Sequence, residues 1–141
     1  MKKLLTLTAA GIFALSFNSC DKKDDEKEQS NQEKLVGNWD VTSQTTTLSR
    51  MGIQLYSDTT RMFTSFEVKN NNTAVFNMDG QSQTADFSIL NDSMITTSLE
   101  GQSITLKYKI QNKNLTLTAS QPVDTMGYTV DMNLLINATK N

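Results

Sequence analysis

The sequence predicts an all-β domain, an antiparallel up-and-down meander that closes into an eight- or nine-stranded barrel. From Leu35 to residue 141, apolar and polar side chains alternate along segments rich in Thr, Val, Ile and Phe, with one proline and no long helical pattern. Closure of such a meander is favoured because it removes exposed strand edges that would otherwise pair with other chains.

A hairpin-sized unit recurs at a spacing of 21 residues. It reads aromatic–x–aliphatic–x–Asn at 66–70, 87–91 and 108–112, and polar turn residues follow each asparagine. Two strands and two short turns account for about 21 residues, whereas the leucine spacing of a solenoid repeat is missing. The predicted strands are 36–47, 52–57, 62–69, 73–79, 83–90, 93–99, 102–111, 114–120 and 127–139.

Alternation along these strands assigns one face of each to the interior. Eight strands enclose either packed side chains or one small ligand, and the sequence leaves both open. The strand after Asn91 carries Met94, Thr96 and Ser98 where the next repeat has larger apolar residues, which suggests a cavity there or a covering loop. The candidate ligand-lining residues are Phe66, Phe76, Met78, Phe87, Met94, Tyr108 and Met132.

Missing residue types exclude several chemistries. The chain has no histidine, so it lacks the commonest general base and the commonest transition-metal ligand. Its single cysteine rules out an intramolecular disulfide. The net charge of −2 argues against nucleic acid, which requires a clustered basic face. We therefore predict no enzyme activity, no catalytic residue, no metal and no cofactor.

The N-terminus reads as an export signal. Lys2 and Lys3 precede the uncharged run 4–17, which is shorter than the about 20 residues of a membrane span. The sequence Phe17-Asn18-Ser19-Cys20 resembles the lipobox of bacterial lipoproteins. That resemblance implies a signal peptide at 1–19 and lipidation of Cys20, which would attach the chain to a membrane. An ordinary secretory signal with an incidental cysteine is the alternative.

A charged segment follows the cysteine. Residues 21–34 contain no aliphatic or aromatic side chain, so 20–34 is predicted to be a flexible tether. Lys23-Asp24-Asp25 resembles the export signal of Bacteroidota lipoproteins, which implies a lipid-anchored protein exposed on the outer membrane surface. Asp21, directly after the cysteine, instead resembles an inner-membrane retention signal, and a periplasm-facing location is the alternative.

The start of the β-domain carries a family resemblance. Gly37-Asn38-Trp39 resembles the Gly-x-Trp opening strand of lipocalins, and the following strands look like the lipocalin-like domains of Bacteroidota lipoproteins. The resemblance covers 35–141 and implies a barrel floor formed by Gly37, Trp39 and a basic residue over the tryptophan, here Lys140.

The resemblance also suggests functions. The segment 48–61, with Met51, Leu55 and Tyr56, is placed where lipocalins have a lid over the barrel mouth, although an extra strand is the alternative. The implied function is an envelope-anchored binding protein for a small, hydrophobic ligand. The alternative is a filled barrel that contacts an envelope protein partner. Neither reading involves nucleic acid.

Overall fold

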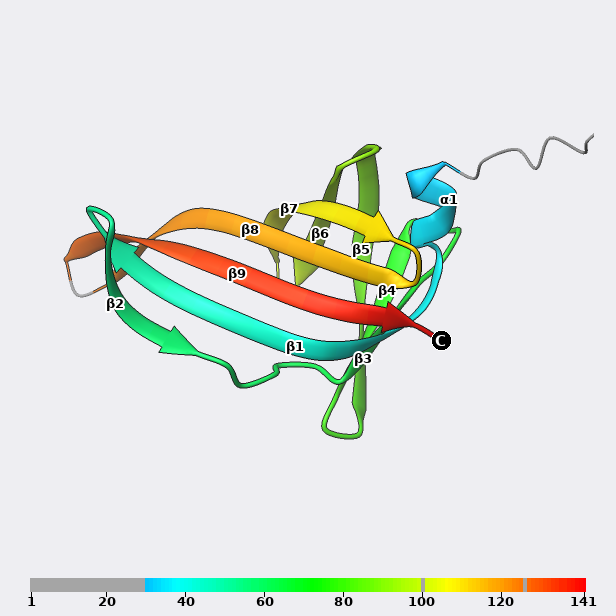
Figure 1. Ribbon diagram of the computed structural model, residues 1–141, viewed down its shortest axis with the longest axis horizontal. Helices are drawn as coiled ribbons and strands as arrows, with labels where there is room; N and C mark the ends of the chain where they lie inside the picture. Colours follow the sequence, from blue (N-terminus) through cyan, green and yellow to red (C-terminus); the bar gives the residue numbers. More distant parts are fainter. Residues whose placement is uncertain (1–29, 100, 126) are drawn as a thin grey trace, which may run out of the picture.

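Nine antiparallel strands and one short helix make up the computed structural model, which describes residues 30–99, 101–125 and 127–141 (Figure 1). The predicted signal peptide, Cys20 and residues 21–29 lie outside these described residues. In chain order the elements are α1 (Asn31–Leu35), β1 (Gly37–Arg50), β2 (Ile53–Asp58), β3 (Ser65–Val68), β4 (Thr73–Met78), β5 (Gln81–Asn91), β6 (Met94–Leu99), β7 (Gln102–Gln111), β8 (Asn114–Thr125) and β9 (Tyr128–Lys140).

The sheet closes through its first and last strands. Strands β3 to β9 pair in sequence order, β1 pairs with β3, and β1 also pairs with β9 from Trp39↔Lys140 to Ser49↔Asp131. Strand β2 pairs only with the second half of β1. The structure is thus a closed eight-stranded barrel plus one additional strand, which confirms the predicted fold class.

A helix replaces the end of the predicted tether. Ser30 caps α1: its Oγ accepts a hydrogen bond from Glu33 N at 3.2 Å, and Glu33 Oε2 accepts one from Ser30 N at 3.1 Å. Leu35 is fully buried at the end of the helix. The helix thus lies within the segment predicted as the end of the tether, and its last residue, Leu35, packs in the core. No helix in the described part of the chain has the length and apolar character needed to cross a bilayer.

The first aromatic position of each repeat packs in the core, as predicted. Phe66, Phe87 and Tyr108 are all at most 5% exposed. The backbone repeats too, because Phe87 N donates to Asn72 O and Tyr108 N donates to Ser93 O, both at 2.8 Å and both fifteen residues back. Turn residues supply the left-handed backbone that tight hairpins need: φ is +60° at Asn72 and +57° at Asn112.

Three strand boundaries differ from the prediction by three or more residues, the first being the end of β1, which lies at Arg50 and not at residue 47. Residues 62–64 belong to a loop. This loop leads from β2, which pairs with the second half of β1, to β3, which pairs with the start of β1. Strand β8 continues through Pro122 to Thr125. Proline is tolerated there because β8 beyond Thr118 pairs only with β9, so its other edge needs no N–H donor.

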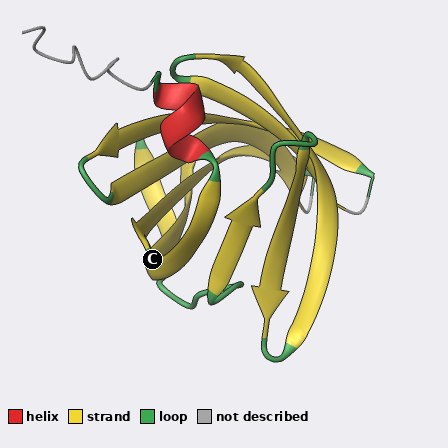
Figure 2. Cartoon of the chain, turned by 90° about the vertical axis from the view of Figure 1, so that its right-hand side faces the viewer, coloured by secondary structure: helices red, strands yellow, loops and turns green. Residues whose placement is uncertain are grey.

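Four strands continue past the barrel. They form a sheet in the order β2-β1-β9-β8, which consists of all of β2, the second half of β1, the start of β9 and the end of β8. This sheet lies at the left of Figure 1, far from α1. We call this sheet the extension. Figure 2 views the molecule from the opposite end, with α1 and the C-terminus toward the reader.

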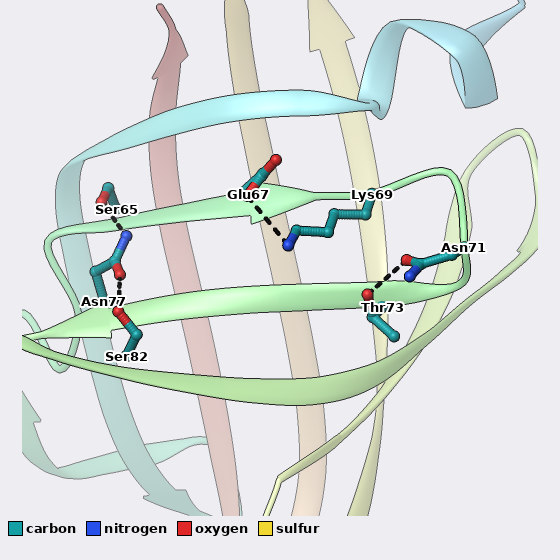
Figure 3. A network of polar contacts seen from close by, with 7 residues as sticks. All are labelled: Ser65, Glu67, Lys69, Asn71, Thr73, Asn77 and Ser82. Carbon is teal, nitrogen blue, oxygen red and sulfur yellow. Dashed lines mark hydrogen bonds and ion pairs between the residues drawn. The ribbon is translucent and has the colours of Figure 1, made fainter.

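The outer wall of β3 and β4 is polar. Asn77 Nδ2 donates to Ser65 Oγ at 2.9 Å, Ser82 Oγ donates to Asn77 Oδ1 at 2.6 Å, and Lys69 lies 3.7 Å from Glu67 (Figure 3). The polar side chains of this wall bond to one another, whereas the extension exposes large apolar side chains.

Candidate functional site

The floor of the barrel joins the two ends of the described chain. Trp39 is fully buried, and its Nε1 donates to Leu35 O at 2.8 Å. Lys140 Nζ lies 5.4 Å from the centre of the Trp39 ring and donates to Lys34 O at 2.8 Å. The structure therefore brings the three predicted floor residues together, and it adds α1, which the sequence reading placed in the tether.

Gly37 makes the close approach at the floor possible. Its φ of +130° lies in a region that residues with a side chain rarely adopt, and a Cβ there would lie 2.9 Å from Lys140 Cε. The arrangement closes the barrel end by packing and hydrogen bonding, and we assign it a structural role.

The barrel interior is almost full. Its central cavity measures about 50 Å³, whereas small-molecule sites occupy roughly 300–1,000 Å³. Its lining is apolar apart from Thr97, and it consists of Leu35, Phe63, Phe66, Val68, Phe76, Phe87, Ile95, Thr97, Ile104, Leu106, Leu117, Leu134 and Ile136. A space of this size accommodates water-sized molecules.

Phe63 fills much of the interior from the loop between β2 and β3. Its ring makes edge contacts with Phe66 at 6.1 Å and Phe76 at 5.2 Å between centroids. The loop is fastened to β1, because Arg61 Nη1 donates to Val41 O at 2.9 Å and Met62 N donates to Gln44 Oε1 at 3.0 Å. Sequence reasoning missed Phe63, since a strand over 62–69 with Phe66 inward would have turned it outward.

Two polar atoms are buried in the barrel wall without a hydrogen-bond partner in the described residues: Gln44 Nε2 and Thr97 Oγ1. Gln44 is 1% exposed and Thr97 4% exposed. Only Thr97 lines the central cavity. The interior therefore offers little polar recognition, which a specific ligand site normally requires.

Most predicted lining residues do face inward. Phe66, Phe76, Phe87 and Tyr108 are buried, Met78 is partly buried against the core, and Met132 is half-buried in the extension. The Tyr108 hydroxyl donates to Asn91 O at 3.1 Å. Burial raises the pKa of the Tyr108 phenol above 10, and the charge of Asp92 adds to this effect.

Met94 is the exception among the lining candidates. It pairs with the exposed Lys107, while its neighbours Ile95 and Thr97 are buried. A β-bulge between Ile89 and Asn91 shifts the register of β5 against β6 by one residue, so β6 turns the face with Ile95 and Thr97 toward the core. Met94, Thr96 and Ser98 consequently lie on the outer face, and the cavity suggested at this strand is not inside the barrel.

The predicted lid residues do not cover the barrel mouth. Met51 is 89% exposed at the turn after β1, and Leu55 and Tyr56 are more than half exposed on β2. Their segment forms the extra strand that was the alternative, because β2 continues the barrel wall by pairing with β1. The element that packs into the barrel is instead the loop carrying Phe63.

A larger hollow lies on the outside, where β7 and β8 separate. These strands pair only from Lys107↔Thr118 to Gln111↔Asn114, so Gln102–Leu106 and Ala119–Thr125 each have one edge without a strand partner among the described residues. A cleft of about 610 Å³ lies at this divergence, and we call it the side cleft. Its lining is Thr45, Thr47, Met94, Thr105, Lys107, Thr118, Ala119, Ser120, Asn133, Leu134 and Leu135.

The lining of the side cleft is partly apolar and partly polar. Met94, Ala119, Leu134 and Leu135 supply apolar surface, and Leu134 also lines the central cavity. The threonines and Ser120 supply hydroxyl groups, and Lys107, which forms no ion pair with any described residue, supplies one positive charge.

Such a cleft can bind by shape, hydrogen bonding and one charge. No group of three or more acidic, histidine or cysteine side chains close enough to hold a metal ion occurs among the described residues. Compared with known proteins, the chain matches no family model, no curated protein and no solved structure.

Proposed function

We propose that this protein is a lipid-anchored interaction module of the bacterial envelope, a filled barrel that binds an extended segment of an envelope protein in its side cleft. One contrast carries the proposal: the interior cavity measures about 50 Å³, whereas the side cleft measures about 610 Å³. The alternative hypothesis, a lipocalin-like protein that binds a small ligand, would require the larger space to lie inside the barrel.

An extended peptide suits the side cleft because of the two strand edges that flank it. Each edge presents main-chain N–H and C=O groups without a ladder partner, along Gln102–Leu106 and Ala119–Thr125. A peptide in β-conformation satisfies such groups, and alternate side chains then reach the adjacent pockets. We expect its inward residues to be small and apolar, to match Ala119 and Leu134, and an acidic residue to face Lys107.

The anchoring part of the proposal rests on the sequence. Cys20 is the only cysteine and follows a signal-like run directly. Ten residues lead from Cys20 to Ser30, which could span at most about 36 Å. The described chain begins at the floor end of the barrel, so a lipid on Cys20 would leave the extension as the end farther from the attachment point.

Substitution of the cysteine tests the anchor. We expect Cys20→Ser to move the protein from the membrane fraction to the soluble fraction, because acyl chains, and not a membrane-spanning helix, would hold the wild type. Ser19→Ala, which keeps a small residue before the cysteine, is the control and should stay membrane-bound. Retention of Cys20→Ser in the membrane would contradict lipid anchoring.

Site-specific photocross-linking in the native host tests the cleft. A photoreactive phenylalanine at Thr105 should form a discrete adduct with one envelope protein, and the same residue at Thr84, exposed on the outer wall, should not. Adding Ser120→Trp should abolish the adduct, because the indole would fill the cleft from an exposed position.

A second experiment tests whether the cross-linked segment of the partner binds as an added β-strand. A synthetic copy should bind and slow hydrogen exchange of the amides in 102–106 and 119–125. An adduct that forms equally at Thr84, persists with Ser120→Trp, or yields a peptide giving no such protection would refute the proposed function.

A further inference from the structure

The outer edge of β2 has no strand partner among the described residues. Strand β2 pairs with β1 from Thr46↔Asp58 to Arg50↔Ile53 and lies at the end of the strand order. Its other edge therefore carries main-chain donors and acceptors that face away from the molecule. Strands β1 and β9 separate this edge from β8, although the lining of the side cleft reaches Thr45 and Thr47 of β1.

Large apolar side chains accompany this edge. Met51 is 89%, Ile53 68%, Leu55 58% and Tyr56 53% exposed, and Met62, on the loop that follows, is 64% exposed. We call these five side chains the β2 patch. They contrast with the polar wall of β3 and β4, whose side chains bond to one another (Figure 3).

The usual protections of a free edge are weak here. Strand β2 contains no lysine, arginine or proline, although these residues commonly block edge-to-edge pairing. Its one charged residue, Asp58, accepts hydrogen bonds from Thr60 N at 2.9 Å and Thr60 Oγ1 at 2.8 Å, so the carboxylate is engaged within its own turn. One protection is present, a bulge opposite Leu48 and Ser49 that leaves Leu55 as the unpaired residue.

We propose that β2 pairs antiparallel with β2 of a second copy of this chain, around a two-fold axis near Leu55. An identical strand is self-complementary in this arrangement. The two Asp58 carboxylates then lie at opposite ends of the pair, each about 17 Å from the Ile53 end of its own strand, so no like charges face each other. Parallel pairing would instead place the two carboxylates side by side.

The area of the β2 patch fits a dimer. At roughly 200 Å² for a large side chain, the exposed parts of its five residues amount to about 650 Å² on one chain, and so to as much as about 1,300 Å² for the pair. Specific protein interfaces bury about 1,200–2,000 Å². Because the bulge limits main-chain pairing to a few residues, burial of these side chains has to provide most of the association.

Disulfide trapping in intact membranes tests the dimer without detergent. Cysteine scanning with Leu55→Cys and Tyr56→Cys in the full chain, whose own Cys20 thiol would be blocked by the proposed lipid, should give a disulfide-linked dimer after mild oxidation. Its yield should be at least about fivefold above that of the matched control Thr84→Cys, an exposed position on the outer wall that pairs with Val75 of β4. Adding Ile53→Lys to Leu55→Cys should reduce the dimer to the control level, because the new charges would enter the interface. Unchanged protease resistance of the variant would show that it still folds.

The result separates this inference from the proposed function. Dimers at the control level for both cysteine variants would overturn the inference, as would trapping that is insensitive to Ile53→Lys. A β2 patch that instead binds phospholipid vesicles while the chain stays monomeric would also overturn it. Neither outcome affects cross-linking at Thr105, because Thr105 lies on β7, which is not part of the extension.

Discussion

At the residue scale, Phe63 decides whether this barrel is filled or hollow. Its ring is 8% exposed and packs edge-on against Phe66 and Phe76, although it comes from a loop. Buried aromatic side chains contribute through both area and edge-to-face contacts. A side chain of this size inside the barrel leaves no room for a ligand of ordinary dimensions.

Truncation of Phe63 should therefore destabilise the fold strongly. We expect Phe63→Ala to lower the free energy of unfolding by about 3–5 kcal/mol, because it enlarges an existing cavity. Urea denaturation measures this, with Met62→Ala as the control, since that neighbour is exposed and should change stability by about 0.5 kcal/mol at most. A loss below about 1 kcal/mol for Phe63→Ala would show that the ring does not fill the interior.

Tyr108 should make the free energy of unfolding depend on pH in the alkaline range. Its pKa is raised above 10 in the folded state by burial and, secondarily, by Asp92. Its contribution is complete below pH 10 and is lost as the pH rises further, because the unfolded chain ionises first. Tyr108→Phe should lose about 1 kcal/mol at neutral pH with the bond to Asn91 O, yet its stability should fall less steeply than that of the wild type as the pH rises above 10. Parallel slopes in urea titrations would contradict this.

At the element scale, strands paired on both sides were predictable and free ends were not. Residues 73–78 form β4, within one residue of the predicted 73–79, because alternation is enforced where a strand is paired on both sides and each side chain must face either core or solvent. The boundaries failed where pairing is one-sided or local: β8 runs on through Pro122, and α1 depends on the Ser30–Glu33 capping box rather than on an apolar pattern.

The candidate site was less predictable than the fold. The resemblance to lipocalins predicted that the floor residues Gly37, Trp39 and Lys140 lie together, whereas the bulge after Ile89 turned Met94 outward against the prediction. The side cleft arises from the divergence of β7 and β8, a property of pairing length that single-strand patterns do not encode. Phe63 escaped for a similar reason, since a loop does not keep strand alternation.

The turn between β7 and β8 requires a left-handed backbone at Asn112, and substitutions there test this requirement. Asn112 has a φ of +57°, which glycine adopts freely and β-branched residues avoid. Asn112→Gly should leave the unfolding free energy within about 0.5 kcal/mol, whereas Asn112→Val should lower it by about 1–2 kcal/mol. Lys113→Val, at the next turn position, is the control, and an equal loss there would mean that backbone strain is not the cause.

At the scale of the whole molecule, the parts separate along one axis. The floor, with α1, Trp39 and Lys140, closes one end of the barrel, and the extension projects from the other (Figure 1). The free edges of β2 and β8 lie at opposite ends of the strand order in that extension, and the side cleft reaches from β8 across β9 to Thr45 and Thr47 of β1. In the proposed arrangement the floor end is attached to the membrane, and the extension carries the contacts with proteins.

The most direct test of the filled barrel is native mass spectrometry of the protein gently extracted from its own host. We expect the measured mass to be that of the lipidated chain, alone or with a second copy or a protein partner, and without a bound small molecule. A hydrophobic small molecule retained in the folded protein would contradict the filled interior and restore the ligand-binding interpretation.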